Sequence, residues 1–425
     1  MSEEYTSMWQ SLGLDLAAHD ALLNVLGQAY QDIYLAQKNR PDGMKYFDFV
    51  MSEVHGLRIK ELLEEKAAGR KIVGSYCVFV PEEIVLAANA TLVGLCAGAD
   101  FALEEAEKLL PRNTCSLIKS TFGFKLGKVC PYLESADMVV GENTCDGKKK
   151  AYEILDTLIS NLYVMDLPQV KSVAGRELLK TEYYRFKAAL EKLTGVTVDK
   201  QALEKGIKTV NEKRKAVHRL NRLRAADPAP ISGLDALLVN QVFFYDNPAR
   251  FTSSVNMICD ELEGRIREKS GISSGKRPRI LVSGCPMAVP NWKLPWIVET
   301  SGAVIVGEES CVGERGSRNL VNGDGTTLDD LMEAVIDRYF AIDCAVFTPN
   351  QSRLDHIVEM AAAYKADGVI HYGLQFCQPY LMESLPVEKA LKDKGIPVLR
   401  VETDYGPEDA GQLKTRVEAF LEMLK

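Results

Sequence analysis

The sequence lacks the features that would place it in a membrane or on nucleic acid. No apolar stretch approaches the roughly 20 residues that a membrane-spanning helix needs, and the N-terminal MSEEYTSMWQ does not resemble a secretion signal. The formal net charge is −8, and the lysines are spread along the chain apart from Lys148, Lys149 and Lys150, which disfavours a general nucleic-acid binder. We therefore expect a cytoplasmic protein with neither a membrane nor a nucleic acid as its partner.

Nucleotide-binding motifs are also missing. GFKLGKV at Gly123 and GISSGKR at Gly271 each have one residue too few between the glycines of a phosphate loop, and no Ser or Thr follows either lysine. The dinucleotide fingerprint G-x-G-x-x-G does not occur. If ATP drives the reaction of this protein, we expect another protein to hydrolyse it.

Ten cysteines are present, but none has the close spacing of a zinc ribbon or a ferredoxin. Six of them end apolar runs that predict buried strands: Cys77, Cys96, Cys145, Cys285, Cys311 and Cys377. Open α/β sheets bind their ligands at the carboxyl ends of their strands, so these sulfurs should point into crevices. Cys115 and Cys344 precede apolar stretches and are predicted at helix starts, where the helix dipole favours a thiolate.

These eight cysteines form two sets of four, one in each half of the chain, while Cys130 and Cys259 fall outside both sets and are predicted to be structural. Cys115 and Cys145 are about as far apart as Cys344 and Cys377. The repetition predicts two α/β domains of similar plan, each with a group of thiolates. The alternative is that the cysteines are small buried hydrophobes. Structural disulfides are not expected in a cytoplasmic chain of 425 residues.

Four regions are predicted along the chain: a helical N-terminal region (residues 1–70), a first α/β domain (71–162), a charged helical connecting and dimerisation region (163–269) and a second α/β domain (270–425). The fold class is therefore α/β with two parallel sheets. DPAPISG, from Asp227 to Gly233, is predicted to break two helices.

Several charged or polar residues near the cysteines are candidates for moving protons. We single out Glu142, Glu308 and His371 as catalytic candidates, although such side chains are often helix caps or ion-pair partners. Lys119 and Lys148 to Lys150 place positive charge near predicted helix starts, a cost that an anionic thiolate cluster would offset. Soft sulfur ligands select iron–sulfur clusters, zinc or copper(I) over harder metals.

Six segments together carry a resemblance to a known family: SYCVFVPEE, NTCSLIKS, GENTCDGKKK, GEESCVGERG, IDCAVFTPN and LQFCQPY. They resemble the 2-hydroxyacyl-CoA dehydratase D-component family, and most closely its double-cubane-cluster branch of ATP-dependent reductases. The resemblance covers residues from about 40 to the C-terminus. It implies two flavodoxin-like or Rossmann-like parallel-sheet domains with an iron–sulfur cluster in the cleft between them.

The resemblance also implies a ligand set. In a double-cubane [8Fe–9S] cluster, Cys77, Cys115 and Cys145 would hold one cubane, and Cys311, Cys344 and Cys377 the other. Dehydratase subunits instead carry one [4Fe–4S] cluster on three cysteines. Cys96 and Cys285 fit the strand-end pattern equally well.

Three functions follow as hypotheses. The first is a homodimeric, oxygen-sensitive reductase of a small molecule, whose low-potential electrons come from a separate ATP-hydrolysing [4Fe–4S] activator. The second is a 2-hydroxyacyl-CoA dehydratase subunit, and the third is a non-catalytic iron–sulfur carrier. Four motif cysteines in each half favour the first, because a dehydratase subunit needs only three thiolates.

Overall fold

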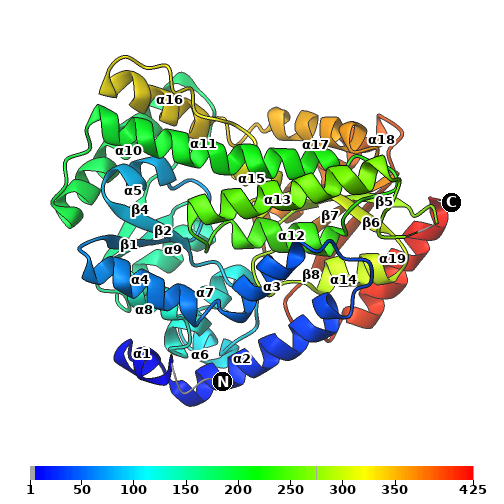
Figure 1. Ribbon diagram of the computed structural model, residues 1–425, viewed down its shortest axis with the longest axis horizontal. Coiled ribbons are helices and arrows are strands. Elements are labelled where there is room, and N and C mark those ends of the chain that lie inside the picture. The colour runs from blue at the N-terminus through cyan, green and yellow to red at the C-terminus, as the bar shows by residue number, and fades with distance from the viewer. Residues whose placement is uncertain (1–4, 274, 425) are drawn as a thin grey trace.

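Two four-stranded parallel sheets form the centre of the protein in a computed structural model, which describes residues 5–273 and 275–424 (Figure 1). The first sheet has the order β2-β1-β3-β4, and the second has the matching order β6-β5-β7-β8. Their strands are β1 (Lys71–Ser75), β2 (Ala90–Gly94), β3 (Met138–Glu142), β4 (Leu162–Met165), β5 (Arg279–Gly284), β6 (Val304–Glu309), β7 (Gly368–Leu374) and β8 (Val398–Thr403). The predicted α/β class with two sheets of one plan is confirmed.

Four strands are buried along their whole length because both of their faces are covered. Every residue of β3, β5, β6 and β7 is buried, as expected for parallel strands between layers of helices. The edge strand β4 has only one buried residue out of four, Met165. Because its apolar pattern is weak, no strand was predicted there, and the connecting helical region was expected to begin at Tyr163.

Helices precede and cover the first sheet. They are α1 (Thr6–Ser11), α2 (Leu16–Tyr30), the π-helix η2 (Gln31–Leu35), α3 (Met44–Ser52), α4 (Leu57–Ala67), α5 (Glu82–Ala87), α6 (Leu103–Glu107), α7 (Ser116–Leu126), α8 (Pro131–Ser135) and α9 (Asp146–Leu155). Within the described residues, those before β1 are helical as predicted. They do not form a separate unit, because Tyr30 and Tyr34 pack edge-on against Trp292, which precedes the helix α14 (Lys293–Thr300) in the second half of the chain.

The connecting region consists of α10 (Val173–Thr194), α11 (Lys200–Leu223), α12 (Gly233–Val242) and α13 (Pro248–Arg267). The side chains of Ser172, Asp199, Ser232 and Asn247 cap these four helices by accepting hydrogen bonds from first-turn N–H groups. The predicted break at Asp227 to Gly233 separates α11 from α12. All ten residues of α12 are buried, so this helix belongs to the core.

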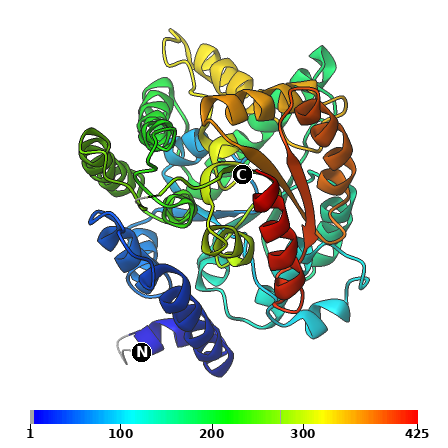
Figure 2. The same ribbon diagram turned by 90° about the vertical axis from the view of Figure 1, so that its right-hand side faces the viewer.

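Helices cover both faces of the second sheet: α14, α15 (Glu314–Ser317), α17 (Gln351–Ala363), α18 (Gln378–Lys392) and α19 (Ala410–Met423). The helix α16 (Leu328–Phe340) packs instead on α10 and α11, and its buried residues join the core of the first sheet. Figure 2 shows the C-terminal helix α19 in front of this sheet and the helices α17 and α18 on its other side. Among the described residues, no helix combines the length and the apolar character that crossing a membrane requires.

Candidate metal centre

One large cavity is lined by eight of the ten cysteines, and these are the eight of the two predicted sets: Cys77, Cys96, Cys115, Cys145, Cys285, Cys311, Cys344 and Cys377. Its volume is about 1140 Å³, slightly above the roughly 300–1,000 Å³ typical of ligand cavities. The other two cysteines are elsewhere. Cys259 is fully buried in the core on α13, and Cys130 precedes α8 without lining the cavity.

The cavity lies where the carboxyl ends of both sheets meet. Cys77, Cys96 and Cys145 follow β1, β2 and β3 by two or three residues. In the second sheet, the cysteines that come one to three residues after β5, β6 and β7 are Cys285, Cys311 and Cys377. The strand-end prediction is confirmed for all six.

The two cysteines predicted at helix starts differ in outcome. Cys115 is the N-cap residue of α7, as predicted. Cys344 lies before a turn instead, and the next helix, α17, begins only at Gln351. Pro349 disfavours helical backbone at Thr348, so a helix that started after Cys344 could not continue past that residue. Cys145 and Cys377 are themselves N-cap residues, of α9 and α18.

Sulfur contacts join the two halves of the chain. Cys77 interacts with Cys311, and Cys115 with Cys377, which also interacts with Cys285. Burial is the main cause that raises the pKa of Cys344, and the charge of the nearby Cys311 thiolate adds to it. We call Cys77, Cys311 and Cys344 the first sulfur group, and Cys115, Cys285 and Cys377 the second sulfur group.

The first sulfur group contains a stabilised thiolate. The interaction with Cys77 is the main cause that lowers the pKa of Cys311, and burial opposes it. Arg315 contributes to the same shift, since its Nη1 donates to the Cys311 sulfur at 3.5 Å. The interaction with Cys311 and burial together raise the pKa of Cys77. Of these two thiols, Cys311 is therefore the one that ionises more readily.

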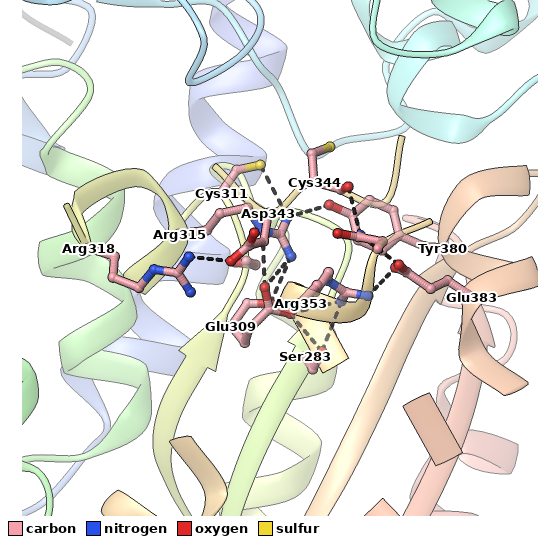
Figure 3. A network of polar contacts seen from close by, with 12 residues as sticks. Ser283, Glu309, Cys311, Arg315, Arg318, Asp343, Cys344, Arg353, Tyr380 and Glu383 are labelled. Carbon is pink, nitrogen blue, oxygen red and sulfur yellow. Dashed lines mark hydrogen bonds and ion pairs between the residues drawn. The ribbon is translucent and has the colours of Figure 1, made fainter. Parts of the chain in front are cut away.

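A buried polar network holds Arg315 in place (Figure 3). The guanidinium of Arg315 donates to Glu309 through Nε at 3.0 Å and Nη2 at 2.5 Å, and through Nη1 to the Tyr380 hydroxyl. Arg353 donates to the other Glu309 oxygen at 2.8 Å and to the Ser283 hydroxyl at 3.0 Å. Burial alone would raise the pKa of Glu309, but Arg315 and Arg353 together hold that pKa at about 2. Tyr380 also lines the cavity.

Sequence reasoning missed this network. Arg315 lies in the segment GEESCVGERG, four residues after Cys311, which was the available signal. Arg353 and Tyr380 lie on α17 and α18, and only the folded chain brings them to β6.

A second buried cation, Lys148, lines the cavity in the first turn of α9. Its Nζ donates to the Tyr76 carbonyl oxygen at 3.3 Å, and the Cys96 thiol donates to the same oxygen at 2.8 Å. Burial alone would lower the pKa of Lys148. The opposite effect of its neighbours is larger and raises this pKa; these neighbours are Tyr152, Cys77, Cys96 and Glu142. The neighbouring Lys149 and Lys150 are exposed, and Lys119 pairs with Glu107.

None of the three predicted acid–base residues lines the cavity. Glu142 comes closest: it accepts the Cys77 backbone N–H at 3.1 Å, and burial raises its pKa to about 7. Glu308 is held by Arg224 in a buried two-pronged ion pair with both distances 2.6 Å. His371 contacts the Tyr380 carbonyl oxygen at 3.1 Å, and burial lowers its pKa to about 4. The positions of Glu308 and His371 give no support to a catalytic role.

Comparison with known proteins identifies the family. A sequence profile described as 2-hydroxyglutaryl-CoA dehydratase, D-component, matches residues 77–424, which include all eight cavity cysteines. The chain belongs to this D-component family. The resemblance drawn from six short segments is thereby confirmed at the level of the family.

Named relatives of this D-component protein include dehydratase and reductase subunits. It is 38% identical to the "Putative dehydratase subunit YjiM" of Escherichia coli K12, over 88% of this chain and 96% of the relative. It is 29% identical to the "(R)-phenyllactyl-CoA dehydratase beta subunit" of Clostridium sporogenes, over 84% and 92%. Identity to one of the benzoyl-CoA reductase subunits of Thauera aromatica is 23%, over 83% and 89%.

The residues of this D-component protein fit an iron–sulfur cluster by their chemistry. Thiolates are the usual ligands of such clusters, and eight thiol groups from two domains line one cavity. Within residues 5–273 and 275–424, no three His, Cys, Asp or Glu side chains are gathered closely enough to hold a single metal ion.

Proposed function

We propose that the protein is an oxygen-sensitive iron–sulfur reductase that uses a double-cubane [8Fe–9S] cluster to reduce a small molecule. One observation carries the proposal: both sets of four cysteines, from two separate sheets, line the same cavity. A single [4Fe–4S] cluster on three cysteines would leave most of these thiols unused. When bound, the cluster would supply electrons of low potential to a substrate in the cavity.

Six cysteines are proposed as its ligands: Cys77, Cys115, Cys145, Cys311, Cys344 and Cys377. The contacts between Cys77 and Cys311 and between Cys115 and Cys377 favour cubanes that each draw ligands from both halves, in place of one cubane per half. Cys96 and Cys285 line the same cavity, but both are engaged with the backbone. Cys96 donates to the Tyr76 carbonyl, and Cys285 accepts the Leu374 N–H at 3.4 Å.

The remaining residues of the cavity would bind the substrate and shield it from water. Apolar and neutral polar side chains predominate among them, including Phe244, Tyr245, Gln241 and Leu354. Gln241 is held rigidly, since its amide group bonds to the Met287 carbonyl at 2.7 Å and to the Trp292 indole at 2.9 Å. Such fixed walls favour binding of a small molecule in one orientation.

Electrons are proposed to come from a separate ATPase that carries its own [4Fe–4S] cluster. The absence of phosphate-loop and dinucleotide motifs from the sequence supports a division of labour between two proteins. The working form is proposed to be a homodimer, as two-fold symmetry is the commonest in soluble oligomers.

Iron and sulfide analysis after anaerobic purification tests the cluster directly. We expect about eight irons per chain, from six thiolate ligands and the [8Fe–9S] composition, and a brown colour that is lost in air. About four irons would overturn the double cubane in favour of the dehydratase subunit, and one zinc would overturn both.

The names of the relatives favour a second candidate, a 2-hydroxyacyl-CoA dehydratase subunit. The relatives from Escherichia coli and Clostridium sporogenes are both named as dehydratase subunits. Under this proposal the chain would pair with a different subunit and hold one [4Fe–4S] cluster. Assaying both activities on the same iron-loaded preparation separates the candidates: dehydration of 2-hydroxyacyl-CoA esters supports the dehydratase, and ATP-dependent reduction of an alkyne supports the reductase.

A further inference from the structure

The two sulfur groups have different electrostatic surroundings. In the first sulfur group, Arg315 Nη1 lies 3.5 Å from the Cys311 sulfur. Lys148 donates to the Tyr76 carbonyl, directly beside Cys77 in the chain. Both cations are buried, with relative exposures of 3% for Arg315 and 9% for Lys148. Charges act strongly at such sites because little water screens them.

Arg315 keeps its position and its charge because of the network behind it. Glu309 and Glu383 balance the formal charges of Arg315 and Arg353, but the four groups are not equally near the sulfurs. Figure 3 shows Arg315 between Cys311 and Glu309, and Glu383 beyond Arg353. Of these four groups, the one that contacts a cysteine sulfur is positive, and the two carboxylates lie further away. The buried Glu142, which accepts the Cys77 N–H at 3.1 Å, offsets part of the charge of Lys148, so Arg315 is the main cation of this group.

The second sulfur group is surrounded mainly by weaker donors. Cys115 interacts with the N–H groups of Leu117 and Ile118, and Cys377 with the N–H group of Tyr380. Leu374 N–H donates to the Cys285 sulfur at 3.4 Å. The N-termini of α7 and α18 add a partial positive charge of about half a unit each, which decays within a turn.

This difference bears on where a cluster in the cavity accepts its electron. Added electron density is more stable next to a fixed positive charge, and hydrogen bonds to the ligating sulfurs raise the reduction potential. We propose that Arg315, assisted by Lys148, makes the first sulfur group the end of the cluster that is reduced first. The inference rests on the proposed function: the ATPase partner is oxidised by one electron, and the cluster is reduced by one electron at that end.

The test is an anaerobic redox titration of the iron-loaded protein with titanium(III) citrate, followed by electron paramagnetic resonance. R315Q and K148Q should each shift the first reduction step to a more negative potential and leave the second step nearly unchanged. R315K, which keeps the charge but loses the forked contacts, should shift the first step less than R315Q. K149Q, which removes the exposed lysine next to Lys148, should shift neither step.

The outcomes separate this inference from the proposed function. A wild-type chain that binds no iron–sulfur cluster would overturn the function itself. If the chain binds the cluster but R315Q and K148Q shift only the second step, or no step, the inference is overturned and the function is not. If R315Q fails to bind iron because Glu309 loses a partner, the K148Q titration alone decides whether the inference holds.

Discussion

The ion pair between Arg224 and Glu308 allows a structural role for Glu308 to be separated from a catalytic one. The two side chains are 2% and 1% exposed, and Arg224 also donates to the Ile305 carbonyl at 3.1 Å. The pair links the end of α11 to β6. R224M leaves the Glu308 carboxylate buried without its partner, which typically costs about 3–5 kcal/mol.

A double-mutant cycle separates two effects on the free energy of unfolding: the loss caused by an unpaired buried charge and the net contribution of the ion pair. R224M/E308L removes both charges and replaces them with apolar groups, and such replacements of buried pairs are often neutral or stabilising. We therefore expect the double variant to recover most of the about 3–5 kcal/mol lost in R224M. E308Q, which keeps one hydrogen-bond acceptor, should lie between the wild type and R224M.

Urea unfolding of the iron-free protein measures these changes. Trp292 and Trp296, at the start of α14 and within it, report on the second sheet by fluorescence, since α14 packs on β6. Circular dichroism of the same samples checks that the fold is retained. If E308Q kept full stability but abolished turnover of the iron-loaded protein, Glu308 would be catalytic and a purely structural role for its ion pair would be refuted.

Four further predictions concern the cavity and the assembly. C115S and C344S should lose about half of the bound iron or more. C130S and C259S, whose cysteines lie outside the cavity, should match the wild type in iron analysis. Equal loss in all four variants would contradict the division into ligand and structural cysteines. Mild oxidation of the iron-free protein should cross-link Cys77 to Cys311 and Cys115 to Cys377, because these thiols line one cavity and interact in pairs. Peptide mapping that finds only pairs within one half of the chain would contradict this prediction. Sedimentation at micromolar concentration should give a dimer mass, and a monomer would rule out the homodimer. MgATP alone should not change the protein, whereas an ATPase partner with a strong reductant and MgATP should support alkyne reduction; equal turnover without ATP would refute the coupling.

The sequence was sufficient to predict the two sheets and the placement of six cysteines because buried parallel strands are long apolar runs with clear ends. β5, β6 and β7 are buried throughout, and each is followed by a cavity cysteine. The edge strand β4 was missed because three of its four residues are not buried. Local signals therefore succeed where a strand is mostly buried, as in the edge strands β2 and β6, and fail for the short and largely unburied β4.

Features that depend on distant parts of the chain were not predictable. The repeated spacing of the cysteines predicts one sulfur cluster in each half, and it gives no sign of the interactions of Cys77 with Cys311 and of Cys115 with Cys377 across the cavity. Glu308 was singled out for its place beside Cys311, but its neighbour Glu309 is the carboxylate that contacts Arg315. One position along a strand reverses the face on which a side chain lies, so adjacent glutamates have different partners.

The long separation of the sulfur contacts along the chain constrains how the protein matures in the cell. Cys77 contacts Cys311, and Cys115 contacts Cys377. A ribosome must release most of the polypeptide before either pair exists, so metal insertion cannot guide early folding as it does in a zinc finger. Both sheets have to be built with every thiol still reduced. An oxidant that reaches the newly made chain before iron would therefore close the site, and the interval between synthesis and loading is the stage at which this protein is most vulnerable to air.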